Sequence, residues 1–321
     1  MARLWVPSYD CILLVISSKM ASPRVTLFLS IPFMIIGFLL SRSPSMMTSV
    51  SPSKPWADGP MKLITTPQFQ TKKTDIFTSG ATHMALLHNS ILRGYNSIYH
   101  QAPLLLDQDK ADFIGYALAW YRFVKSHHDD EEASLFTKVE ELLQDKTVFE
   151  ETHHEHESFL AGLAEFEKYL SGLQSPTDFS ADELLQIMST FQEPFEKHFH
   201  SEISTIAKFS EHPNAPKEGT PENTAAAATF KAWGKSTVTK AGMTDVVPFF
   251  LLNLDRTVED GMWAHWPPMP APIKWGLINI AGAFHSGWWK FASCDANGQP
   301  QELWAYRAAA IKAQKEEQAR A

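Results

Sequence analysis

The stretch SHHDDEEASLF (residues 126–136) places two histidines and four acidic residues inside a segment that has the spacing of a helix. His127 and Glu131 are four residues apart, so they lie on the same face of that helix. From about 109 to 144, apolar residues recur at steps of three and four on this same face. The face is therefore directed at a core, and the presence of an imidazole and a carboxylate on it needs an explanation.

Three further segments, at about 81–101, 148–172 and 180–209, have the same helical period. Their connections are short, and helices joined by short connections pack as antiparallel neighbours. We therefore predict an all-α fold, an antiparallel four-helix bundle over residues 75–210.

Polar residues occupy the core-facing side of all four predicted helices. A buried carboxylate without a partner costs several kcal/mol, so it must be protonated, ion-paired or bound to a metal. No Lys or Arg lies on these faces nearby, whereas a metal would satisfy every polar group at once. Imidazole and carboxylate ligands suit iron, manganese or zinc, and their number suits two ions. The predicted ligands are His88, His127, Glu131, His156, His198 and Glu202.

The same helices resemble a known family. The similarity lies in LLHNSILRGYNSIY (86–99), HHDDEEASLFTKVE (127–140), HESFLAGLAEFEKYL (156–170) and EKHFHSEI (196–203). In this order they resemble the helices of the hemerythrin-like, or HHE cation-binding, domain of fungal proteins. The resemblance implies that the six residues ligate two non-haem iron ions bridged by oxo or hydroxo groups. The pattern departs at Leu160, where the family has a second histidine, so one iron would have one protein ligand fewer.

Three functions are compatible with such a centre. The histidine-rich set favours reversible binding, so we first expect a protein that binds or senses oxygen, nitric oxide or iron, with a small diatomic molecule as partner, rather than an enzyme. The alternatives are a di-iron oxidase or peroxidase with a substrate pocket, and a structural or interaction module stabilised by its metal.

Other histidines near the predicted ligands have simpler interpretations. His128 and Glu132 are predicted to form an exposed pair one turn apart. His153 and His154 are predicted to be surface residues of the first turn of their helix, and His153 is kept as a substitute for the missing ligand.

Charge and cysteine content exclude several classes of protein. The formal charge of −8 argues against nucleic acid as a partner. Cys11 and Cys294 are the only cysteines, which excludes a disulfide framework and any site made of several thiolates.

Residues 1–60 form a predicted N-terminal extension of different composition. The uncharged run VTLFLSIPFMIIGFLL (25–40) is flanked by Arg24 and Arg42, and residues 42–60 read as a Ser/Pro-rich linker. Two interpretations remain open. The run is a membrane anchor for a domain of the cytoplasmic type, or it belongs to an upstream extension that the working protein lacks.

Residues 211–321 hold seven of the ten tryptophans and many prolines. So much aromatic area would be unfavourable in water. We therefore predict an aromatic and Pro-rich C-terminal extension of irregular segments and short helices packed on the outside of the bundle. A charged helical tail is expected from about Leu303.

Overall fold

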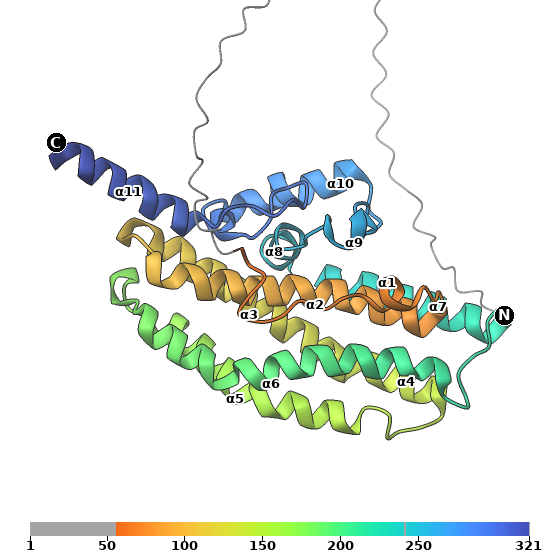
Figure 1. Cartoon of the computed structure of the whole chain (residues 1–321). Helices are drawn as coiled ribbons and strands as arrows, with labels where there is room; N and C mark the ends of the chain where they lie inside the picture. The colour runs from red at the N-terminus through yellow and green to blue at the C-terminus, as the bar shows by residue number, and fades with distance from the viewer. Residues whose placement is uncertain (1–55, 241, 321) are drawn as a thin grey trace, which may run out of the picture. The chain divides into compact units, whose positions relative to one another are not determined.

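The computed structural model describes residues 56–240 and 242–320 (Figure 1). The regular elements in these ranges are all helices, apart from one isolated β-bridge between Cys294 and Pro300. The predicted all-α class is confirmed.

The predicted bundle helices are present with small changes at their ends. The first begins earlier than expected because the Asp75 carboxylate caps it by accepting hydrogen bonds from the backbone amides of Phe77 and Thr78. The fourth begins after Ser180, whose hydroxyl accepts from the amide of Glu183. The helices are α2 (Ile76–Gln101), α3 (Lys110–Asp130), α5 (Glu150–Gly172) and α6 (Ala181–Lys208).

Neighbouring helices of the bundle run in opposite directions. In the α2–α6 pair, His88 lies against Phe199, whereas the later residue Tyr95 lies against the earlier residue Met188. Helix α6 also packs along α5, and α3 closes the ring by contacting both α2 and α5 (Figure 1). The same reversed order holds between the second bundle helix and α5, where Trp120 in α3 lies against Phe166, and Glu132, just after α3, contacts His156. It also holds between α5 and α6, where His156 lies against His198 and Tyr169 donates to the carbonyl oxygen of Ser180.

The second helix of the bundle changes its winding halfway along. α3 continues into a π-helix, Glu131–Leu135, and then into α4 (Phe136–Leu143). Together they span the predicted second helix, 109–144. Single turns of π-helix are uncommon and are often found at functional sites.

The C-terminal residues pack onto α2 and α3. They form α7 (Pro221–Lys240), α8 (Val246–Leu252), α9 (Val258–Gly261), α10 (Ala271–Gly276), a π-helix (Leu277–Ala281), 3₁₀ turns and α11 (Trp304–Arg320). Helix α8 is buried along its whole length and contacts α2 and α3. The Phe249 ring lies 4.8 Å from the Tyr116 ring, measured between centroids. One apolar core therefore includes both the bundle and the extension.

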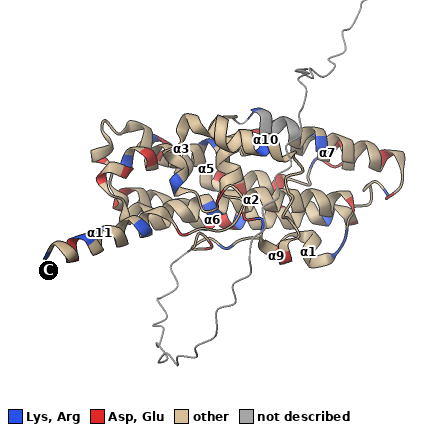
Figure 2. Cartoon of the chain, turned by 90° about the horizontal axis from the view of Figure 1, so that it is seen from above, with Lys and Arg blue, Asp and Glu red and all other residues tan. Residues whose placement is uncertain are grey.

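The last residues of the expected linker are also packed. Ala57 and Met61 are almost fully buried, and the Asn96 side chain binds the backbone of both. Residues 25–40 lie outside the described residues. Within the described residues, none of the helices is both long enough and apolar enough to cross a bilayer. Acidic and basic residues are interspersed along the helices of the described part (Figure 2).

Candidate metal centre

The six predicted side chains converge inside the bundle. His88 comes from α2, and His127 and Glu131 come from the end of α3 and the start of the π-helix. His156 comes from α5, and α6 supplies His198 and Glu202. Each of the six is at most 3% exposed, although all are polar.

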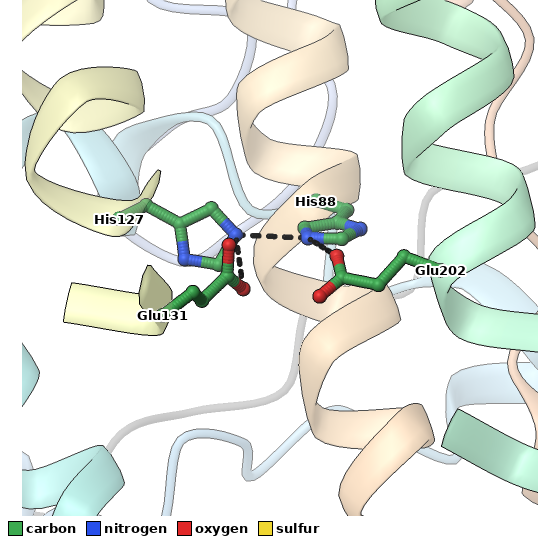
Figure 3. A group of neighbouring side chains, drawn as sticks. All are labelled: His88, His127, Glu131 and Glu202. Atoms are coloured by element: carbon green, nitrogen blue, oxygen red, sulfur yellow. Dashed lines mark hydrogen bonds and ion pairs between the residues drawn. The ribbon is translucent and has the colours of Figure 1, made fainter. Parts of the chain in front are cut away.

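The four imidazoles form two facing pairs. The Nε2 atoms of His88 and His127 are 2.9 Å apart (Figure 3). The Nε2 atoms of His156 and His198 are 3.2 Å apart. Each pair joins helices that are neighbours in the bundle, so the two pairs together involve all four helices.

Each carboxylate lies between the two imidazole pairs. Glu131 places one oxygen 3.1 Å from Nε2 of His127 and the other 4.0 Å from Nε2 of His156. Glu202 Oε2 lies 3.4 Å from Nε2 of His88 and 3.8 Å from Nε2 of His198. One potential ligand atom from each of His88, His127, Glu131 and Glu202 lies within 4.8 Å of the others, and the Nε2 atoms of His156 and His198 lie within 4.0 Å of an oxygen of these two carboxylates.

The carboxylates have lost water without gaining hydrogen bonds. Neither oxygen of Glu131 or Glu202 accepts a hydrogen bond from the described residues. Burial, followed by the charge of Glu202, raises the pKa of Glu131 well above its usual value, and burial also raises the pKa of Glu202. A bound cation would remove both penalties by supplying positive charge to these oxygens.

The imidazoles are held in the neutral form that binds a metal. Burial lowers the pKa of all four, and it lowers that of His127 to about 3. The Nδ1 atom of His88 lies 3.3 Å from the carbonyl oxygen of Phe199, and that of His156 lies 2.6 Å from a carboxylate oxygen of Glu132. A proton on Nδ1 in these contacts leaves the Nε2 lone pair directed at the centre.

Glu155 lies beside the outer nitrogen of His198. The Nδ1 atom is 3.6 Å from Oε2 of Glu155, beyond hydrogen-bonding distance, and no described residue gives it a hydrogen bond. Burial alone would raise the pKa of Glu155, but the adjacent His198 ring and the contacts with Ser201 and Lys197 outweigh it and hold the pKa at about 2. The ionised carboxylate stabilises the His198 ring in its present orientation.

The structure corrects the sequence prediction for His128 and Glu132. His128 is only partly exposed, and its ring lies 4.3 Å from the His156 ring, measured between centroids. Glu132 is turned toward α5, where it binds Nδ1 of His156 and lies 2.9 Å from Nδ1 of His153. The two residues therefore line the bundle instead of forming an exposed pair.

Two features of this part of the helix account for the difference. His127 and His128 both lie in α3 and point about 100° apart, and the buried face of a helix can be wider than that. Glu132 lies in the π-helix, whose wider turn changes the direction of the side chains that follow Asp130. Apolar spacing does not reveal such a turn, because the helix remains continuous on both sides of it.

The other candidate ligands of α5 are placed away from the centre. His153 is directed at Glu132, and its side chain is 42% exposed. His154 and Glu157 face solvent. Leu160 is partly buried and packs against the core. The suggestion that His153 replaces a ligand at position 160 therefore finds no support in these contacts.

Comparison with known proteins finds a match to a family model over the bundle. Residues 79–209 match the hemerythrin HHE cation binding domain. The chain is also 29% identical over 263 residues to "Dimeric xanthone biosynthesis cluster protein R11" from Cryptosporiopsis sp. (strain 8999), and this covers 80% of the chain and 95% of the relative. The alignment is longer than the matched domain, so the likeness extends beyond the bundle. No solved structure matches the chain.

Proposed function

We propose that the bundle, which matches the hemerythrin HHE cation binding domain over residues 79–209, holds a non-haem di-iron centre that binds a small diatomic ligand, oxygen or nitric oxide. The observation that carries the proposal is the position of Glu131 and Glu202. Both are buried without hydrogen-bond donors from the described residues, and each lies between two pairs of neutral imidazoles.

The donor set fits two metal ions. His88 and His127 would hold one ion, His156 and His198 the other, and the two carboxylates would be shared. A single tetrahedral zinc ion needs only four donors and would leave buried groups without a partner. Imidazole and carboxylate are ligands that iron accepts. When bound, iron supplies a redox-active centre with a coordination position open to a small molecule.

Burial of the site favours a small ligand. All six side chains are at most 3% exposed, and the rings of Phe136, Phe159 and Phe199 pack against the imidazoles. We therefore expect a diatomic molecule to reach the centre more readily than an organic substrate. This difference ranks reversible binding above oxidation of an organic substrate.

A second candidate function comes from the relative. Its name assigns it to a cluster for dimeric xanthone biosynthesis, which favours a di-iron oxidase acting on an aromatic compound as the alternative. That alternative requires oxygen to be consumed in proportion to a phenolic probe. Reversible binding requires no such consumption.

The test uses the full chain loaded with iron(II) without oxygen. We expect about two iron ions per chain, loss of iron in His127→Ala and His198→Ala, and uptake of nitric oxide with a change in the optical spectrum. His200→Ala is the matched control, because His200 lies on the same helix but binds the carbonyl oxygen of Lys62.

Two results would overturn the proposal. If the loaded protein binds neither nitric oxide nor azide and iron only raises its melting temperature, the metal is structural. If oxygen disappears in proportion to an added phenol, the protein is an oxidase.

A further inference from the structure

We propose that His128 is an additional metal ligand, which supplies an imidazole to the metal position formed by His156 and His198. The inference rests on the proposed dinuclear centre and concerns a residue outside the six discussed above. His128 stands on the chain directly after His127, yet its contacts are with the other imidazole pair.

The first argument is proximity. One potential ligand atom from each of His128, Glu132 and His156 lies within 4.8 Å of the others. The His128 and His156 rings meet edge to face, at an interplanar angle of 81°. His128 is therefore in direct contact with an imidazole that we assign to the second metal position.

The second argument is the state of the His128 side chain. Its Nδ1 atom is buried, and no described residue gives it a hydrogen bond. Glu132, the partner expected one turn away, is instead bound to His153 and His156. A buried imidazole nitrogen without a partner is unfavourable, and coordination to a metal would satisfy it.

The third argument is the number of donors. Helix α5 contributes one imidazole, because Leu160, one turn after His156, is an apolar side chain packed against the core. Without His128, the second position would have two imidazoles and the shared carboxylates. With His128 as a ligand, α3 would supply this position with a third imidazole.

The experiment compares His128→Ala with the unmodified full chain. Both are loaded with ⁵⁷Fe(II) without oxygen, and the two iron environments are followed by Mössbauer spectroscopy together with chelator competition. We expect the signal of one iron to change, and the weaker of the two binding steps to become at least about tenfold weaker. His153→Ala is the control, because His153 binds the same Glu132 but is partly exposed.

A rescue distinguishes a ligand from a packing residue. The double substitution His128→Ala with Leu160→His returns an imidazole to the same metal position from α5, so it should restore the affinity of the weaker step. Circular dichroism of the metal-free variants checks that each is folded.

The outcomes separate this inference from the proposed function. If the unmodified chain binds two irons and His128→Ala leaves both iron signals and both affinities unchanged, His128 is not a ligand. Failure of the double substitution to rescue a weakened site would assign His128 a packing role. If the unmodified chain itself does not bind two irons, the dinuclear centre is wrong.

Discussion

Replacing Glu202 by Gln should stabilise the metal-free protein while weakening its iron binding. The Glu202 carboxylate is fully buried, and none of the described residues donates a hydrogen bond to its oxygens. The unfolded chain ionises Glu202 freely at neutral pH, whereas the folded chain must protonate it or bury its charge at a cost of about 1–3 kcal/mol, and Gln avoids that cost because it carries no charge. We expect the free energy of unfolding to rise by about 1–3 kcal/mol, or the melting temperature by roughly 2–10 °C.

Iron should reverse the order of stability. A ligand present at about 1,000 times its dissociation constant stabilises the folded state by about 4.1 kcal/mol, which exceeds the gain expected for the variant. The variant lacks one of the two shared carboxylates and should lose most of this stabilisation by iron. The assay is urea denaturation of both proteins, once with a chelator and once with iron(II).

Glu155→Gln provides the control of opposite sign. Glu155 is also buried, but its carboxylate accepts a hydrogen bond from the Ser201 hydroxyl and lies 3.2 Å from Nζ of Lys197. Its replacement should lower the stability of the metal-free protein by about 1–3 kcal/mol. Equal destabilisation by Glu155→Gln and Glu202→Gln would refute the reasoning, because Glu202 would then have partners that offset its burial.

Three further predictions concern pH and packing. In the metal-free protein, the pKa of all four imidazoles is lowered, so below about pH 6.5 they bind protons in the unfolded chain and not in the folded one. The free energy of unfolding should therefore rise with pH up to about 6.5, by about 1.4 kcal/mol per pH unit for each imidazole. The pKa of Glu131 and of Glu202 is raised, so these two groups lower the free energy of unfolding as the pH increases above about 4.5. Stability should therefore decline beyond about pH 6.5, and denaturation at several pH values would detect the maximum. Phe249→Ala should cost about 3–5 kcal/mol, and circular dichroism and tryptophan fluorescence should still report one common transition. Gly115→Ala should lower the free energy of unfolding by about 1–3 kcal/mol, because the added Cβ would lie 2.1 Å from the Trp288 ring. Gly80→Ala should raise it by about 0.5–1 kcal/mol, because a Cβ there meets no atom within 4 Å, and thermal melts would measure both.

The bundle and the convergence of six polar residues were predictable because both depend on helical periodicity. The step from His127 to Glu131 fixes a common face, and the apolar residues of the same helix indicate that this face is buried. The short connections predicted that neighbouring helices run in opposite directions, but they did not predict which residues face each other across two helices. The division into two imidazole pairs with Glu131 and Glu202 between them required coordinates.

The environment of His128 could not be predicted from the spacing. His128 points about 100° away from His127, and the positions of the neighbouring helices decide whether the buried face is wide enough to include it. The sequence also did not predict which helices the extension packs against, for a different reason. Its contacts, such as Phe249 against Tyr116, join residues far apart in the sequence, whereas composition reveals only that the aromatic residues must be buried.

The extension and the polar centre are connected through the stability of α2 and α3. Residues such as His88 and His127 occupy positions on the inner faces of these helices that apolar side chains would otherwise fill, so the metal-free bundle has less favourable burial there. Helix α8 supplies apolar burial on other faces of the same two helices, where Phe249 meets Gly94 and Tyr116. Since burial of a phenylalanine contributes about 1.5–3 kcal/mol, a few such contacts are of the same size as the cost of an unpartnered carboxylate. We therefore expect the extension to keep α2 and α3, and the side chains that they carry, in place in the metal-free protein.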